Sequence, residues 1–175
     1  MRKLENEELN RKTTLEFIEA PKTPIVIVLD NVRSLNNVGS VFRTADAFLV
    51  EAIYLCGITG QPPNKDIQKT ALGATDTVEW KYYKDTLDAV AELKKNGYLV
   101  CAIEQAEAAI MLNNFIPDRK QKVAVIFGNE VKGVQQAVID ACTGVIEIPQ
   151  IGTKHSFNIA VSVGIVMWDL YLKIK

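Results

Sequence analysis

The sequence is poor in the residues that build metal centres and disulfide frameworks. It contains one histidine, His155, and three cysteines, Cys56, Cys101 and Cys142, with no CxxC pair. Zinc sites need about four ligands at short, regular spacings, so this composition argues against a metal site. An odd number of widely spaced cysteines, two of them in apolar runs, instead predicts reduced thiols that pack as small hydrophobic groups.

The sequence also lacks long hydrophobic segments and a large net charge. The longest apolar stretch, residues 159–168, includes Ser162 and is shorter than the roughly 20 residues that a membrane helix needs. The N-terminus is charged and acidic, unlike a secretory signal, so we expect a cytoplasmic protein without a membrane partner. The formal net charge of −1 argues against nucleic-acid binding by bulk electrostatics alone but leaves room for a local basic face.

The common nucleotide and hydrolase motifs are missing as well. There is no GxGxxG and no GxSxG. Residues 128–133 resemble half of a P-loop, but Val134 and Gln135 follow where a lysine and a serine or threonine are needed. A standard dinucleotide site, phosphoryl transfer and serine hydrolysis are therefore disfavoured.

What the sequence does contain is an alternation of apolar strand-like runs with amphipathic helical segments. This pattern predicts an α/β fold with a mainly parallel sheet and helices on both faces. We divide the chain into an N-terminal helical extension, residues 1–22, and one domain, residues 23–175. The expected strands are 25–29, 52–56, 77–80, 98–103, 123–127 and 145–148, and the expected helices are 4–18, 38–48, 65–72, 85–95, 133–141 and 158–174.

Polar segments follow several of these strands directly. Ligands of such sheets bind beyond the carboxyl ends of the strands, so the polar turns predict one shared site. Arg43 lies among apolar residues at the start of a helix, and a guanidinium there requires a partner or a task. An ion pair with Glu130 or Asp46 is the structural alternative to a functional role.

Four short motifs together resemble one known family. They are NVG at 37–39 with RTA at 43–45, IFGNEVKGV at 126–134, IPQIG at 148–152 with SFNIAVS at 156–162, and KTALGA at 69–74. The first three, in their order along the chain, are similar to the SpoU family, also called TrmH, of RNA 2′-O-ribose methyltransferases within the SPOUT superfamily, and KTALGA also resembles this family. The resemblance covers roughly residues 23–173.

The resemblance implies methyl transfer from S-adenosylmethionine to a ribose 2′-hydroxyl of RNA. It also implies a homodimer, a C-terminal trefoil knot and no metal. A short chain without an appended RNA-binding domain favours tRNA over rRNA as the substrate. The chain departs from the family pattern at Asn129, Gln150 and Phe157, which affects the shape of the adenosine pocket.

The resemblance also implies roles for individual residues. The residues expected at the chemistry are Arg43, Asn37, Glu130, Ser156 and Asn158. Arg43 is expected at the dimer interface beside the target ribose, where it grips a phosphate. The structural alternatives are helix N-capping for Asn37 and Ser156, and a favourable position at a helix start for Glu130.

A second set is expected to hold the methyl donor, largely through backbone and apolar groups. Its members are Ile103, Glu104, Gly128, Asn129, Ile148, Ile151, Ser156 and Asn158. Gly128 is expected to let the backbone approach the ligand closely. Ala160 and Gly164 lie four residues apart on the last helix, which favours either core packing or a dimer seam.

Two other functions stay open at this point. The same fold can serve as a non-catalytic RNA- or nucleoside-binding module, or as a small-molecule enzyme that uses another nucleotide. The joint presence of Arg43, Glu130, Ser156 and Asn158 argues against the first, and the missing GxGxxG and P-loop argue against the second.

Overall fold

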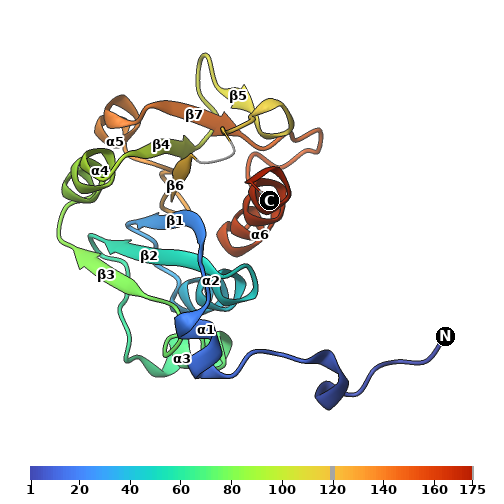
Figure 1. Ribbon diagram of the computed structural model, residues 1–175. Helices are drawn as coiled ribbons and strands as arrows, with labels where there is room; N and C mark the ends of the chain where they lie inside the picture. The colour runs from blue at the N-terminus through green and yellow to red at the C-terminus, as the bar shows by residue number, and fades with distance from the viewer. Residues whose placement is uncertain (119–120, 175) are drawn as a thin grey trace.

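The structure, a computed structural model, describes residues 1–118 and 121–174. Its centre is a seven-stranded sheet in the order β3-β2-β1-β6-β4-β7-β5, in which all neighbouring strands pair in parallel (Figure 1). The strands are β1 (Thr23–Asp30), β2 (Val50–Cys56), β3 (Trp80–Tyr83), β4 (Tyr98–Ile103), β5 (Ile110–Met111), β6 (Lys122–Phe127) and β7 (Gly144–Glu147). The predicted fold class is confirmed.

Helices cover both faces of this sheet. One face carries α2 (Leu35–Ala47), α3 (Lys65–Ala71) and α6 (Ile159–Ile174), and the opposite face carries α4 (Thr86–Lys95) and α5 (Gln136–Ala141) (Figure 1). None of the helices in the described part of the chain is long and apolar enough to cross a bilayer.

The apolar run of β1 shows how one strand serves both layers. Ile25, Ile27 and Leu29 pack in the cluster beneath α2 and α6, whereas Val26 and Val28 pack in the cluster beneath α4. Successive side chains of a strand point to opposite faces, so a strand covered on both sides must be apolar throughout. All five side chains are at most 1% exposed, as the unbroken run predicted.

The glycine of the first motif is explained by helix packing. A Cβ built on Gly39 would lie 2.1 Å from Thr70 Oγ1 and 2.2 Å from the carbonyl oxygen of Ile67. The Thr70 hydroxyl also donates to the Asn36 carbonyl at 2.9 Å. Gly39 therefore allows α2 and α3 to touch backbone to backbone, and this contact fixes α2 on the sheet.

The cysteines behave as the composition predicted. All three are free, and Cys56 and Cys101 are buried. Burial raises the pKa of Cys56 and of Cys101 to about 12, and that of Cys142 to about 11. These thiols stay protonated and pack as apolar groups.

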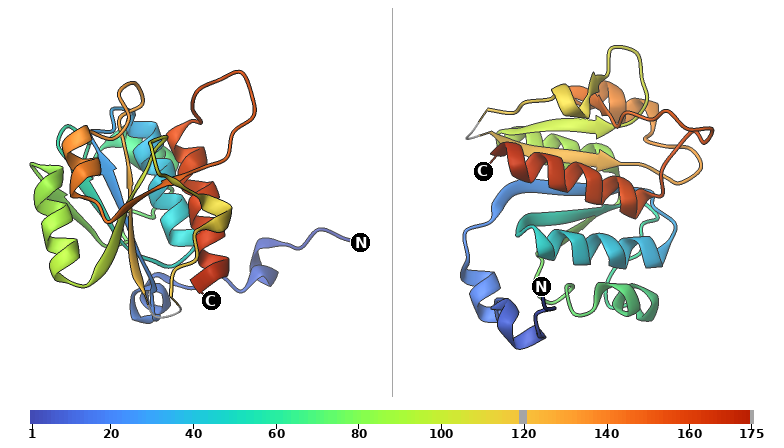
Figure 2. Two further views of the ribbon diagram at one scale, coloured as in Figure 1. Left: turned by 90° about the horizontal axis from the view of Figure 1, so that it is seen from above. Right: turned by 90° about the vertical axis from the view of Figure 1, so that its right-hand side faces the viewer.

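The predicted N-terminal helix over residues 4–18 is wrong. The segment forms a 3-10 turn, η1 (Asn6–Leu9), and a short helix, α1 (Thr14–Glu19), separated by Asn10 in the left-handed region. Its apolar residues are spaced irregularly and form no common face, and only Phe17 is buried. Residues 1–19, which we call the N-terminal arm, extend away from the domain on the side of α6 (Figure 2). The division at residue 22 stays a prediction.

Three other element predictions need correction. Residues 77–79 are not a strand, because the turns after α3 continue through Thr77, whose hydroxyl donates to Asp46 Oδ2 at 2.6 Å. Helix α5 begins at Gln136 and not at Gly133, since residues 130–134 form a turn. The pattern also missed β5 and the 3-10 turn η2 (Leu112–Asn114). The knotted threading of the tail remains a prediction.

We expect the substitution Gly39→Ala to lower the free energy of unfolding by roughly 1–3 kcal/mol, because the new methyl group would overlap backbone atoms of α3. Urea denaturation measures this change. Gly144→Ala is the matched control, since a Cβ there meets no atom within 4 Å. Equal stability of the two variants would contradict the packing role of Gly39.

Candidate ligand pocket at the carboxyl edge of the sheet

The turn after β6 is shaped by its own glycines and by Asn129. The backbone groups of Asn129 and Gly133 exchange two hydrogen bonds of 3.0 and 2.8 Å. Gly133 has a φ of +69°, and a Cβ built on Gly128 would lie 2.1 Å from the Gly133 carbonyl carbon. What passes close to Gly128 in the structure is the chain's own residues 133–134, and the expected close approach to a ligand stays a prediction.

The side chain of Asn129 is used within the protein. Its oxygen accepts from the backbone N–H groups of Val131 and Lys132 at 2.9 and 3.1 Å, and its amide donates to the Asn31 carbonyl at 2.8 Å. Asn129 therefore closes the turn after β6 and fastens it to the end of β1. Its predicted contact with the methyl donor remains untested.

Glu130 ties this turn to the start of α2. Its carboxylate accepts from the backbone N–H groups of Arg33 and Ser34, both at 3.0 Å. Burial works to raise the pKa of Glu130, but these backbone hydrogen bonds outweigh it and the net pKa is lowered. Glu130 is thus held as a carboxylate, with both oxygens already accepting hydrogen bonds.

Two asparagines extend this link to the last helix. Asn37 Nδ2 lies 3.5 Å from Glu130 Oε1, and Asn158 Nδ2 donates to Asn37 Oδ1 at 3.3 Å. Side chains that are 121 residues apart in the sequence therefore meet, and the three predicted motifs converge. These residues lie at polar turns for which the sequence predicts one shared site, and their chemical roles stay predictions.

The predicted capping roles fall on other residues. Ser34 is the N-cap of α2, and its hydroxyl accepts from the Asn37 backbone N–H. At α6 the Asn158 oxygen accepts from the Ala160 N–H at 2.9 Å. Asn37 and Ser156 are therefore not the caps, because α2 begins two residues before Asn37 and α6 begins three residues after Ser156.

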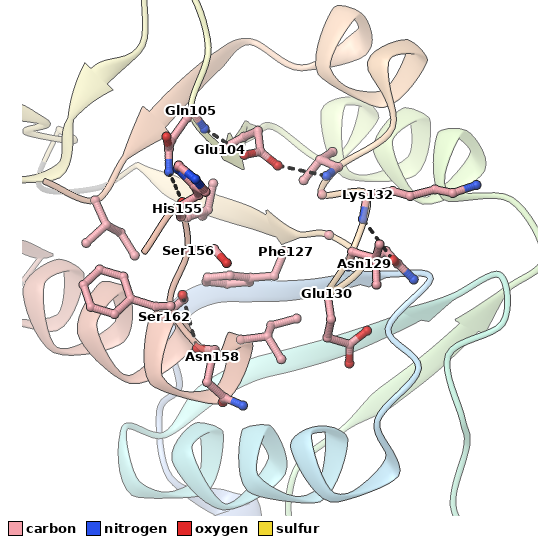
Figure 3. Close-up of a pocket in the computed structure, with 18 of the residues that line it drawn as sticks. Glu104, Gln105, Phe127, Asn129, Glu130, Lys132, His155, Ser156, Asn158 and Ser162 are labelled. Atoms are coloured by element: carbon pink, nitrogen blue, oxygen red, sulfur yellow. Dashed lines mark hydrogen bonds between the residues drawn. The ribbon is translucent and has the colours of Figure 1, made fainter. Parts of the chain in front are cut away.

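A cavity of about 680 Å³ opens between these loops (Figure 3). It lies beyond the carboxyl ends of β4, β6 and β7. Its walls include seven of the eight residues predicted to hold the donor: Ile103, Glu104, Gly128, Asn129, Ile148, Ser156 and Asn158. Gln105, Phe127 and His155 also line it and were not predicted to do so. Gln105 lies two residues after the last residue of β4, so its position behind a buried strand was the available signal.

Three predicted site residues do not line the cavity: Asn37, which contacts the lining residues Glu130 and Asn158, and also Ile151 and Arg43. Ile151 is fully exposed and does not line the cavity. Arg43 also lies outside the lining, on the exposed side of α2, where no described residue forms an ion pair or hydrogen bond with it. The expected pairing with Glu130 or Asp46 is therefore wrong. The charge of Arg43 carries no desolvation cost, because its side chain is exposed to solvent.

A buried carboxylate near the pocket was missed. Asp30, at the end of β1, is fully buried and accepts from the Thr86 hydroxyl at 2.6 Å and from the Gln135 backbone N–H at 3.2 Å. Asn31 Nδ2 also donates to it at 2.8 Å. Asp30 thus joins β1, α4 and the start of α5 beneath the pocket. An aspartate that ends an apolar strand was the signal in the sequence.

The pocket combines an apolar floor with turns that expose backbone groups and with carboxylates held by backbone N–H groups. Such a site at the carboxyl edge of a parallel sheet is typical of α/β proteins that bind a small organic ligand there. Among the described residues no group of three or more His, Cys, Asp or Glu is arranged to hold a metal ion.

Comparison with known proteins identifies the family within this class of α/β proteins. The pattern of the SpoU rRNA Methylase family matches residues 24–168, and the chain belongs to this family. The chain is 29% identical over 153 residues to the 23S rRNA (guanosine-2′-O-)-methyltransferase RlmB of Neisseria meningitidis, covering 87% of this chain and 59% of that protein.

Two solved structures are similar in fold. The TrmH/SpoU tRNA modifying enzyme of A. aeolicus matches with a TM-score of 0.81 at 21% identity, over 91% of this chain and 80% of that one. The AdoMet-bound rRNA methyltransferase of Sinorhizobium meliloti matches with a TM-score of 0.78 at 27% identity, over 91% and 60%. The chain spans about 60% of the length of the curated relatives that it matches.

Glu130→Gln tests the link between the turn after β6 and α2. We expect the free energy of unfolding to fall by about 1 kcal/mol at neutral pH, because the charged acceptor of two N–H groups is lost. The folded-state pKa is lowered, so this contribution exists above the unfolded pKa of about 4.3 and disappears as pH falls through the folded pKa.

Denaturation at several pH values measures the difference between wild type and variant. It should be constant from roughly pH 6 to 8 and shrink below about pH 4. Glu107→Gln is the matched control, since this exposed carboxylate makes no hydrogen bond within the described chain. A difference that persists in full at low pH would rule out the charged link.

Proposed function

We propose that this protein is a cytoplasmic, homodimeric RNA methyltransferase that transfers a methyl group from S-adenosylmethionine to a ribose 2′-hydroxyl. The observation that carries the proposal is the convergence of Asn37, Glu130 and Asn158 at the mouth of the cavity. These residues belong to the three motifs through which the chain matches its family.

The pocket fits the proposed donor. Its volume of about 680 Å³ lies within the range of small-molecule sites. Ile103, Phe127 and Ile148 offer apolar walls to an adenine. Glu104 and Glu130 place negative charge near a cationic sulfonium. When bound, S-adenosylmethionine supplies a methyl group activated by a positively charged sulfur.

The roles of Glu130, Ser156 and Asn158 are assigned from the hydrogen bonds that each side chain already makes in the structure. Glu130 is unsuited to take the hydroxyl proton, because its lowered pKa makes it a weak base and its oxygens are occupied. Ser156 lines the cavity and has no hydrogen bond in the described structure, so its hydroxyl is available to substrate or donor. Asn158 orders the start of α6 at the same place.

Arg43 is proposed to act on the pocket of a second copy. It is exposed, unpaired within the described chain and located on α2, which packs beside α6. A guanidinium can bind a phosphate bidentately and favour the deprotonated ribose oxygen. Arg43 lies outside the pocket of its own chain. In the proposed dimer it faces the pocket of the partner subunit and binds the RNA there.

The proposed dimer contact is the outer face of α6. Val161, Ile165, Trp168 and Leu172 recur at helical spacing, and three of them are at least 50% exposed. A Cβ built on Gly164 meets no atom within 4 Å, so this glycine is not needed for core packing. Between the two roles considered for Ala160 and Gly164, the open surroundings favour the dimer seam.

We propose tRNA in preference to rRNA as the substrate. The two rRNA methyltransferases that the chain resembles are longer, since it covers 59% and 60% of them, whereas it covers 80% of the tRNA modifying enzyme. Mass spectrometry of nucleosides from a strain that lacks this protein would identify the modified RNA and base.

Arg43→Ala tests the assignment of the chemistry. We expect methyl transfer from tritiated S-adenosylmethionine to bulk tRNA to fall at least about 100-fold, because a positioned cation is lost. The melting temperature should not change, since the side chain is exposed and unpaired. Arg11→Ala, another exposed arginine, is the control. Full activity of Arg43→Ala would refute the assignment, and wild-type binding without transfer would favour a non-catalytic module.

Gly164→Leu tests the dimer seam. We expect the subunit dissociation constant, measured by analytical ultracentrifugation, to rise at least about tenfold, because a bulky side chain would hold the two α6 helices apart. Ala91→Leu on the exposed face of α4 is the matched control. A variant that associates as tightly as wild type would place the contact elsewhere.

A further inference from the structure

The segment between β7 and α6 forms the outer wall of the pocket and is almost entirely exposed. Residues 151–158 are all exposed, and the segment loops out from the domain (Figure 2). Gln150, His155, Ser156, Phe157 and Asn158 nevertheless line the cavity. We call residues 149–158 the tail loop. A loop with so little burial needs specific hydrogen bonds to keep its shape.

One side chain holds the tail loop to the sheet. Gln105 Nε2 donates to the His155 carbonyl oxygen at 2.6 Å (Figure 3). In the described structure this is the only hydrogen bond between residues 149–157 and the rest of the chain. Asn158, at the end of the loop, is fixed separately through Asn37 and the start of α6.

The neighbour of Gln105 holds the opposite wall. Glu104 Oε2 accepts from the Val134 N–H at 3.1 Å, and its Oε1 accepts from the Gln105 N–H at 2.9 Å. A Cβ built on Gly133 would lie 2.2 Å from Glu104 Oε2, so the carboxylate occupies the space that this glycine leaves. Two consecutive residues at the end of β4 therefore connect both loops that enclose the cavity.

We propose that Gln105 is a positioning residue that fixes the tail loop against the pocket in the form that binds the methyl donor. The inference rests on the proposed function, because it concerns the same pocket. The amide contributes no charge and contacts no reacting atom. It reduces the ordering that the loop must undergo on ligand binding, and a loop ordered in advance binds more tightly.

The chemistry of the contact determines the variants. A carbonyl oxygen requires a donor, so Gln105→Glu replaces attraction by repulsion with little change of shape. Gln105→Lys keeps a donor on a side chain of sufficient length and should restore the contact. Gln121→Glu makes the same change at the opposite end of the sheet, where the amide lies 3.4 and 3.3 Å from two carbonyl oxygens.

Hydrogen–deuterium exchange without ligand tests the contact directly. We expect peptides covering residues 150–158 to exchange roughly three- to tenfold faster in Gln105→Glu, as the loss of one hydrogen bond predicts. Gln105→Lys and Gln121→Glu should match wild type in these peptides. Unchanged exchange in Gln105→Glu, or a wild-type loop that already exchanges at the unprotected rate, would overturn the proposal.

Donor binding provides the second measurement. The Kd for S-adenosylmethionine and the KM for it should rise roughly three- to tenfold in Gln105→Glu, while kcat at saturating donor is kept. A purely structural defect would instead lower kcat through loss of active protein. If wild type does not bind the donor, the proposed function fails, whereas the exchange experiment still decides whether Gln105 holds the loop.

Discussion

The pocket depends on how closely residues 133–134 pass Gly128. That approach leaves no room for a Cβ, and it turns the chain back so that Asn129, Glu130 and Val134 each meet a different neighbour. Through these three contacts the turn after β6 is attached to β1, to the start of α2 and to β4. Polar contacts that are all satisfied favour one arrangement of the loops. On this side the turn is attached to three neighbouring elements, whereas the tail loop on the other side is exposed.

Much of the fold could be predicted from the sequence because its strands are buried on both faces. Continuous apolar runs such as 25–29 and 123–127, with helical segments between them, indicate buried strands of a parallel sheet. The predictions failed where local signals were weak. The N-terminal arm has apolar residues without a common face, and β5 consists of two residues at the sheet edge. Neither produces a periodic pattern that a sequence can display.

The site was predictable to the extent that motifs follow strands. Carboxyl ends of parallel strands meet at one edge, so the convergence of Asn37, Glu130 and Asn158 could be expected. Individual side-chain roles could not. Whether Arg43 is buried depends on the rotation of α2, and whether Ile151 faces the cavity depends on the path of an irregular loop. The positions of Gln105 and Asp30 at strand ends are visible in the sequence, but the partners of their hydrogen bonds are not, because most of those partners lie far away along the chain.

The protected thiols have a practical consequence. Burial raises the pKa of Cys142 to about 11 and that of Cys56 and Cys101 to about 12, so all three thiols stay protonated at pH 8. Maleimide reagents react with thiolates, so the native protein presents almost no competing site. A single cysteine introduced at Gly152, which no atom crowds, would take a fluorophore selectively. Ligand binding can therefore be followed by fluorescence without first replacing the three native cysteines.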